Sequence, residues 1–486
     1  ELDTTPGRDP APEDNDDEAL SRPENPLVGT RQRADGLVTM DYETCIGCGY
    51  CAVACPYQAR TIVHDEKWYY GEETVQERQV SHDERFGVAQ KCTFCIERVD
   101  DGLANGLSPG VDPAATPACA ASCIAQALHF GDFADPESNV SKLVDDNASF
   151  QMHESLGTDP QIRYLYELDT TPGRDPAPED NDDEALSRPE NPLVGTRQRF
   201  WDYKGAMNFV FGGLASGLAL IAFLQHLLGG VTAAALPLIY AVAGLVMAVG
   251  LTALLFKLGR PFRAFKAVRR PQSSWMTREI YTVAAFYPLV LADLLWPSLT
   301  LHLLVAAAAA GFLVCQARIL YASKGVPAWR APLVPSMLAL TGLFEGAGLI
   351  AIGHALVPGA VPGGVFLAAL GLLLAIVNAA LWRRYCSTAK AVGIGPLSRR
   401  DLARLTPWLH GFGHLLPGLL FLAALVFPAL PTYLTYGLAG AAAILGGATW
   451  KFALVTRICH TQGFALPKLP RRGSGSRAAP ARLEAA

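Results

Sequence analysis

Long apolar runs separated by short polar loops fill the second half of the chain. Most of these runs are long enough to cross about 30 Å of hydrocarbon as helices. They cover residues 205–228, 232–256, 280–296, 299–317, 332–354, 363–382, 408–428 and 432–450. The pattern predicts an all-α polytopic membrane bundle of about eight transmembrane helices over residues 205–456.

Basic residues occur in every second connection between these runs. They lie between residues 257 and 278, 318 and 330, and 383 and 404, whereas the connections around Gly229, Pro297, Pro358 and Pro431 contain no Lys or Arg. Loops rich in Lys and Arg stay on the cytoplasmic side of a membrane. We therefore expect a multi-pass protein of the inner (plasma) membrane with both termini, including a basic tail over residues 457–486, in the cytoplasm.

Residues 1–33 recur without change at residues 167–199. Both copies are rich in Pro, Asp and Glu and lack an apolar face, so they cannot bury enough surface to fold. We interpret the first as a disordered duplicate and the second as part of an acidic linker over residues 161–204. The formal net charge of -5 sums acidic and basic segments, and no basic, aromatic-interleaved patch suggests nucleic acid.

Cysteines cluster between these acidic segments. Eight of the eleven lie between Cys45 and Cys123. The first set forms the C-x2-C-x2-C-x3-C-P run that wraps a [4Fe–4S] cluster in bacterial ferredoxins. Its ligands would be Cys45, Cys48, Cys51 and Cys55. Gly47 and Gly49 allow the backbone to fold closely around the cluster.

A second set consists of Cys92, Cys95, Cys119 and Cys123. Four thiolates at this spacing could hold a tetrahedral zinc ion, but the companion run favours a second [4Fe–4S] cluster. In two-cluster ferredoxins the fourth cysteine of each run ligates the other cluster. By that pairing, Cys123 would complete the cluster of the first set, and Cys55 would complete the cluster of the second set. We expect a ferredoxin-like α+β domain with two [4Fe–4S] sites over residues 34–160.

The segments CIGCGYCAVACPYQAR, KCTFCIERVDDG and PACAASCIAQALHFGD resemble the iron–sulfur subunits of the dimethyl sulfoxide reductase family of molybdenum enzymes. The likeness covers about residues 38–133. Family members usually carry four cysteine groups and four clusters, and this chain matches the last two groups. There the third group shares clusters with the second and the fourth with the first, which is a different pairing from that of two-cluster ferredoxins.

The basic loop over residues 257–279 and the segment 318–329 are similar to the eight-helix membrane anchor of the same family, and most similar to that of cytoplasm-facing sulfite dehydrogenases. The resemblance implies a quinone site in which Glu279 is the quinol-site glutamate. Lys257 stands where the anchor of dimethyl sulfoxide reductase has a histidine. Other candidates for this site are Arg260, Arg263 and Arg278, which otherwise would anchor the loop at lipid headgroups.

Several polar residues lie inside apolar runs. Glu345 would relay protons or bond a neighbouring helix, because an ionisable group in a membrane is costly. Haem needs two facing axial ligands, and His410 and His414 share one helix face, so we interpret them as packing or interfacial residues. The same holds for His226, His302 and His354. Gly213 and Gly217 suit close helix packing. Cys315, Cys386 and Cys459 have no ligand spacing.

Neither half contains a catalytic nucleophile, a molybdopterin site or a nucleotide loop. We therefore expect a non-catalytic subunit that passes electrons between a separate molybdopterin catalytic subunit and the quinone pool. Sulfite oxidation is the preferred reaction, and reduction of dimethyl sulfoxide, tetrathionate or polysulfide is the alternative. A transporter with a redox-sensing domain would instead show inverted repeats.

Overall fold

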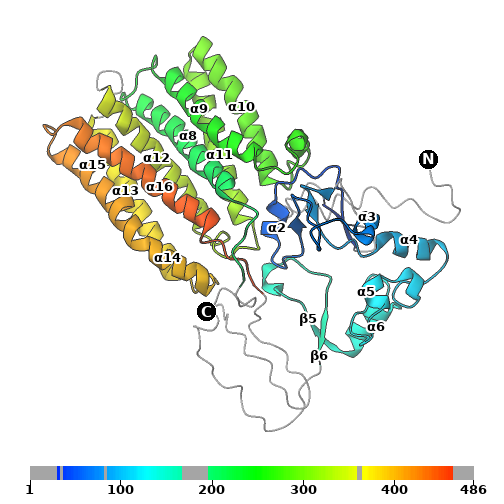
Figure 1. Cartoon of the computed structure of the whole chain (residues 1–486). Helices are drawn as coiled ribbons and strands as arrows, with labels where there is room; N and C mark the ends of the chain where they lie inside the picture. The colour runs from blue at the N-terminus through cyan, green and yellow to red at the C-terminus, as the bar shows by residue number, and fades with distance from the viewer. Residues whose placement is uncertain (1–29, 33–36, 81–84, 167–194, 358–363, 464–486) are drawn as a thin grey trace, which may run out of the picture.

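The computed structural model describes residues 30–32, 37–80, 85–166, 195–357 and 364–463 (Figure 1). The expected acidic duplicate up to residue 29, the linker between residues 167 and 194, and the tail beyond residue 463 lie outside the described residues. The described chain forms a cysteine-rich part followed by a helical part, which lie side by side in Figure 1.

The cysteine-rich part contains short helices and three two-stranded antiparallel sheets. The sheets pair β1 (Thr30–Gln32) with β2 (Val38–Met40), β3 (Thr61–Ile62) with β4 (Ala89–Gln90), and β5 (Ala148–Phe150) with β6 (Tyr164–Tyr166). The helices are α2 (Tyr50–Ala54), α3 (Val75–Val80), α4 (Ile96–Ala104), α5 (Ala118–Ala121) and α6 (Asn139–Asp146), with 3-10 turns η2 (Pro113–Ala115) and η3 (Glu154–Leu156). Elements this short bury little apolar surface, and one core cluster contains only Cys45, Val88 and Ala89.

The helical part is a bundle of long apolar helices. These are α8 (Tyr203–Leu227), α9 (Leu236–Leu255), α10 (Trp275–Leu295), α11 (Leu299–Tyr321), α12 (Val334–Leu356), α13 (Gly364–Thr388), α14 (Pro396–Trp408), α15 (Leu416–Val426) and α16 (Leu438–Thr456). A 3-10 segment, η5 (Pro261–Arg269), precedes α10, and π-helical turns η6 (Leu409–Leu415) and η7 (Tyr433–Gly437) lead into α15 and α16. The predicted fold class, a ferredoxin-type α+β part followed by a helical membrane bundle, is confirmed.

Each apolar window of the sequence falls on a helix, but among the described residues only seven helices are long and apolar enough to cross a membrane. The exception is α10, which contains Arg278, Glu279 and Asp293. These charged residues lower the mean hydropathy of the helix below that of a transmembrane span. By length and hydropathy, seven of the expected set of about eight helices are candidate spans, and α10 packs beside α9 and α11.

Small residues determine how closely the helices approach. A Cβ on Gly217 of α8 would lie 1.8 Å from the carbonyl oxygen of Gly342 in α12, and one on Gly346 would lie 2.1 Å from the carbonyl carbon of Gly217. The backbones of α8 and α12 are thus in direct contact, which the predicted packing role of Gly217 requires. Helix α8 also contacts α9, α11 and α16 and lies at the centre of the bundle.

Candidate functional site

The first cysteine set lies on a tight loop that leads into α2. Cys45 is buried, and Cys48, Cys51 and Cys55 are half-buried. Gly47 and Gly49 have φ angles of 70° and 74°, a conformation that glycine adopts at little cost. The backbone N–H of Ala89 donates to Cys45 Sγ over 3.4 Å, as expected for a sulfur ligand.

Burial raises the pKa of the Cys51 thiol to about 12, although the nearby Arg60 opposes that shift. Burial also raises the pKa of Cys48. Free thiols in this environment are protonated, so their thiolate form needs a cationic partner. An iron–sulfur core bound by these cysteines would supply it.

The second cysteine set lies nearer the surface. Cys92 and Cys119 are exposed, and Cys95 and Cys123 are half-buried. The N–H of Phe94 donates to Cys92 Sγ over 3.3 Å, and that of Ala127 donates to Cys123 Sγ over 3.4 Å. Amides of Ala127 and the following residue lower the pKa of Cys123, which suits a thiolate ligand. Within the described ranges, no three His, Cys, Asp or Glu side chains converge on a single metal ion.

The first cysteine loop docks directly on the loop that follows α9. The N–H groups of Gly259 and Arg260 donate to the carbonyl oxygens of Gly47 and Ile46, each over 3.1 Å. A Cβ on Gly259 would lie 1.9 Å from the carbonyl oxygen of Gly87. Glycine is therefore required for this approach of the two parts.

Three of the predicted quinone-site residues contact the same surface. Lys257 Nζ donates to the Cys48 carbonyl over 3.4 Å. Arg260 Nε donates to the Phe86 carbonyl over 2.9 Å, and Arg263 Nη1 donates to the Tyr42 carbonyl over 2.7 Å. Burial lowers the pKa of Lys257. These side chains thus hold the cysteine-rich part against the bundle, instead of only anchoring the loop at lipid headgroups.

Arg278 and Glu279 lie apart from those contacts, at the start of α10. Arg278 donates to the carbonyl of Pro271 over 2.7 Å, and its guanidinium lies over the Trp275 ring. Glu279 is only 4% exposed and accepts from Asn208 Nδ2 over 3.3 Å. The two neighbouring residues therefore have different environments, Glu279 inside the bundle and Arg278 at its edge.

A continuous series of contacts joins the cysteine loop to Glu279. The indole N–H of Trp201 donates to the Cys48 carbonyl over 3.0 Å, and the Trp201 ring lies 5.8 Å from the Phe209 ring, centroid to centroid. Phe209 follows Asn208, whose amide reaches Glu279. Cys48 and Glu279 are thus linked through two aromatic rings and one amide.

Comparison with known proteins supports the division into two parts. Residues 37–59 match the family model of a 4Fe-4S binding domain, and residues 206–389 match that of the DMSO reductase anchor subunit (DmsC). The chain joins a ferredoxin-type iron–sulfur domain to a DmsC-type membrane anchor. It is therefore a multi-pass membrane protein with an iron–sulfur domain, as the sequence predicted.

Three curated relatives are similar to part of this chain. A Halobacterium salinarum protein, provisionally named as a dimethyl sulfoxide reductase iron–sulfur subunit, is 39% identical over 31% of this chain and 51% of its own length. A selenate reductase subunit of Mesobacillus selenatarsenatis is 36% identical over 29% and 48%. A sulfite dehydrogenase subunit of Allochromatium vinosum is 32% identical over 37% and 61%. The chain thus spans about half the length of the curated relatives that it matches.

Among the described residues, the anchor contains a buried lysine–glutamate ion pair and a buried aspartate–histidine contact. Lys451 Nζ in α16 lies 2.5 Å from Glu345 Oε2 in α12, with both side chains 1% exposed. Of the two roles predicted for Glu345, the structure provides the bond to a neighbouring helix. The sequence analysis missed Lys451, although a lysine inside the apolar run of α16 is itself a signal for a buried partner.

The second contact is a hydrogen bond between His302 Nδ1 and Asp293 Oδ2 over 3.0 Å, and both side chains are buried. It was missed because the two residues lie in successive helices, α10 and α11. The ring of His302 lies 5.6 Å from that of His226, and the rings of His410 and His414 are 5.8 Å apart on one helix face, centroid to centroid. These contacts agree with packing roles for the histidines.

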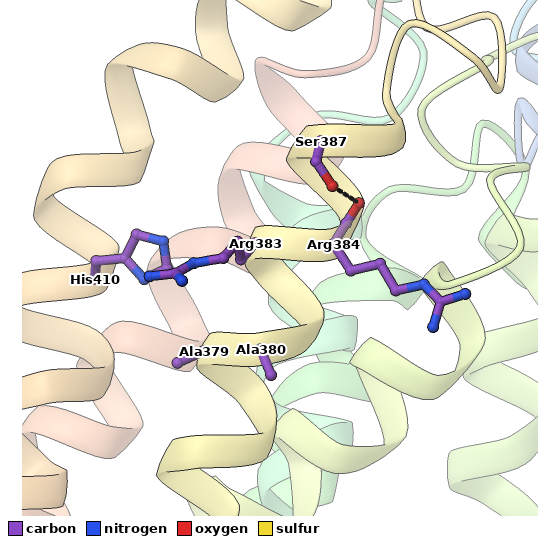
Figure 2. Close-up of a pocket in the computed structure, with 6 residues that line it drawn as sticks. All are labelled: Ala379, Ala380, Arg383, Arg384, Ser387 and His410. Carbon is purple, nitrogen blue, oxygen red and sulfur yellow. Dashed lines mark hydrogen bonds between the residues drawn. The ribbon is translucent and has the colours of Figure 1, made fainter.

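Two of the cavities on the described part of the anchor have sizeable volumes. One of about 650 Å³ lies between the start of α8, α14 and the end of α16, and its lining includes Phe211, Arg404 and Phe452. The other, of about 470 Å³, lies between α13 and η6 (Figure 2). Glu279 lines neither of these two cavities.

Proposed function

We propose that this chain is the electron-transfer and membrane-anchor subunit of a molybdopterin oxidoreductase complex. It would pass electrons between a separate catalytic subunit and the quinone pool. Two [4Fe–4S] clusters, when bound by the eight cysteines between Cys45 and Cys123, would supply one-electron carriers. The domain limits proposed with this function are residues 34–160 for the iron–sulfur domain and 205–456 for the anchor.

The observation that carries this proposal is the docking of the first cysteine loop on the anchor. The backbone N–H groups of Gly259 and Arg260 donate to this loop and hold the iron–sulfur domain against the anchor. Because this contact uses main-chain atoms and three basic side chains, the distance between the first cysteine set and the anchor is defined. A fixed distance is what electron transfer between a cluster and a membrane-bound quinone requires.

Glu279 is the proposed proton-handling residue of the quinone site. A quinone reaction needs an apolar slot, donors to the ring carbonyls and a group that exchanges protons. Glu279 is buried and is joined to the cysteine loop through Asn208, Phe209 and Trp201. Lys257, Arg260 and Arg263 would act indirectly, by holding the iron–sulfur domain, and Arg278 by fixing the start of α10. Glu345 would have a structural role.

The proposed orientation places the iron–sulfur domain and both termini in the cytoplasm. The basic loop after α9 contacts this domain, as does the basic segment after α11, where Lys324 Nζ donates to the Leu156 carbonyl over 2.8 Å. Positively charged loops favour the cytoplasmic side. A cytoplasmic molybdopterin subunit would then dock on the iron–sulfur domain.

Sulfite oxidation is the preferred reaction because the basic loop of the anchor is most similar to that of sulfite dehydrogenases. Selenate, tetrathionate or dimethyl sulfoxide reduction would use the same carriers with electrons flowing in the opposite direction. The named relatives include both kinds of enzyme. Activity of the whole complex with each substrate distinguishes them.

Low-temperature electron paramagnetic resonance of the anaerobically purified chain tests the proposal. Iron and zinc are quantified, and spectra are recorded before and after addition of a quinol analogue. We expect about four irons per cluster and reduced [4Fe–4S] signals that Glu279→Gln abolishes without loss of iron. The matched control, Glu137→Gln, replaces an exposed carboxylate of the iron–sulfur domain and should retain quinol reduction. Zinc without iron, or equal reduction in both variants, contradicts the proposal.

A further inference from the structure

Side chains from three helices meet at Glu279. Asn208 reaches it from α8, with its Nδ2 group 3.3 Å from the carboxylate, and Gln316 reaches it from α11. Both amide side chains are buried, with 3% and 2% of their surface exposed. Helix α11 packs against both α8 and α10 (Figure 1). A side chain of α11 is therefore placed to connect the other two helices.

Gln316 makes this connection through one amide group. Its Nε2 donates to the backbone carbonyl oxygen of Asn208 over 2.7 Å, and its side chain is also hydrogen-bonded to the Glu279 carboxyl group. A primary amide has two N–H donors, so it can serve both partners at once. Gln316 thus ties the carboxyl group of α10 to the backbone of α8.

Two glycines make room for this arrangement. A Cβ on Gly212, one turn after Asn208 in α8, would lie 2.4 Å from Gln316 Nε2. On the other side, a Cβ on Gly311 of α11 would lie 2.9 Å from Cγ2 of Thr282, which is one turn after the carboxyl group in α10. Close approach of membrane helices at small residues is common. Here it brings the Gln316 amide within reach of both neighbouring helices.

The surroundings of Glu279 are mostly neutral. Among the described residues, α8 presents the amide of Asn208 to it, α9 contains no charged residue, and α11 adds the thiol of Cys315. Arg278 lies near Cys315, but its guanidinium lies over the Trp275 ring at the edge of the bundle. Hydrogen bonds donated to a carboxylate favour its ionised form. The amide donors are therefore the groups best placed to control the protonation of Glu279.

We propose that Gln316 is a positioning residue for Glu279 in the quinone reaction. This inference rests on the function proposed above for Glu279. Gln316 would hold the carboxylate at a fixed place beside α8 and stabilise the ionised form that accepts a proton from a quinol hydroxyl group. A buried glutamine with a structural role alone would affect stability, but not the pH at which Glu279 ionises.

The test is the pH dependence of quinol-driven cluster reduction in the full chain carrying Gln316→Met. This exchange keeps an unbranched side chain of similar length and removes its donors. The rate should rise with pH as Glu279 ionises, and loss of a donor should move the midpoint up by about one pH unit, which is about tenfold in rate below the midpoint. Well above the midpoint, the rate should return to that of the unaltered chain.

The matched control is Asn378→Leu. It removes another buried amide of the anchor, which donates to the Leu374 carbonyl over 2.8 Å within α13, and it should leave the midpoint unchanged. If Gln316→Met does not fold, Gly212→Ala displaces the same amide without removing it. We expect that variant to shift the midpoint in the same direction, and an unshifted midpoint in folded Gly212→Ala would refute the inference.

A second measurement separates this inference from the proposed function. Difference infrared spectroscopy of the purified chain without quinol reports the protonation of carboxyl groups, and Glu279→Gln identifies the band of Glu279. Its midpoint should rise in Gln316→Met as the rate profile does. An unshifted band, or a loss of rate that is equal at every pH, overturns the role of Gln316. If the band shifts but Glu279→Gln retains quinol reduction, the quinone role of Glu279 is wrong, although Gln316 still positions its carboxyl group.

Discussion

Replacing Lys451 with methionine removes the partner of a carboxylate at the centre of the bundle. Glu345 Oε2 loses the ammonium group 2.5 Å away, and Glu345 Oε1 already has no hydrogen-bond partner among the described residues. Both side chains are 1% exposed, so water cannot replace the lost contact. Leaving one buried charge unpaired costs about 3–5 kcal/mol.

The double replacement should cost much less. Glu345→Met combined with Lys451→Met leaves two apolar side chains of similar volume, and such exchanges of a buried ion pair are often neutral or stabilising. The expected coupling energy is therefore at least about 2 kcal/mol, well above the average of about 0.6 kcal/mol for hydrogen bonds between membrane helices. This magnitude separates a buried ion pair from ordinary polar packing.

The assay is a double-mutant cycle on reversible unfolding of the purified chain in mixed micelles. The control pair is Asp401 and Arg404, whose closest atoms are 4.0 Å apart and whose arginine is 70% exposed. Such a surface pair should couple by no more than about 0.5 kcal/mol. If the costs of Glu345→Met and Lys451→Met add to within about 0.5 kcal/mol, the assignment of a buried ion pair is wrong.

Three further predictions concern the iron–sulfur domain and its contact with the anchor. Cys45→Ser should remove about four irons per chain, whereas Cys315→Ser should leave the iron content unchanged, as measured by metal analysis. Gly259→Ala should weaken the contact between the iron–sulfur domain and the anchor by about 1–3 kcal/mol, because its Cβ would overlap the Gly87 carbonyl. We expect slower reduction of the clusters by quinol at equal iron content. An unchanged rate would contradict this prediction. Burial lowers the pKa of His153, whose Nε2 contacts the Gly463 carbonyl at 3.1 Å. Between that lowered pKa and about 6.5, the unfolded chain therefore binds more protons than the folded chain, and the free energy of unfolding should fall as the pH decreases. The measurement is the melting temperature as a function of pH. A His153→Gln variant with the same pH slope as the unaltered chain would refute this prediction.

The cysteine spacing and the apolar windows were sufficient to predict the fold class. A C-x2-C-x2-C-x3-C-P run has a specific meaning, because three thiolates on one loop reach three irons of one cluster. Long apolar runs are equally informative, because a backbone in lipid must satisfy its own hydrogen bonds. Helix α10 differs from the other apolar windows because it is not among the candidate membrane spans. Its residues Arg278, Glu279 and Asp293 lower its mean hydropathy.

The partners of individual polar residues could not be predicted in the same way. Glu345 and Lys451 are separated by 106 positions in the chain, and sequence spacing says nothing about contacts at that distance. Lys257, Arg260 and Arg263 form a basic loop in the sequence, which fits a quinone site, lipid headgroups or a protein surface equally well. Their contacts with the carbonyls of Cys48, Phe86 and Tyr42 are seen only in the folded chain.

The sequence by itself thus determined the classes of structure: an iron–sulfur domain, a membrane bundle and the loops on which chemistry is expected. Those properties follow from local spacing and hydropathy, which act over a few residues or one helix. Tertiary structure decided which residues meet, namely the docking of Gly47 on Gly259, the burial of Glu279 beside Asn208 and the pairing of Glu345 with Lys451. These contacts depend on how whole helices pack, because close approach and desolvation are properties of the folded chain and not of any segment.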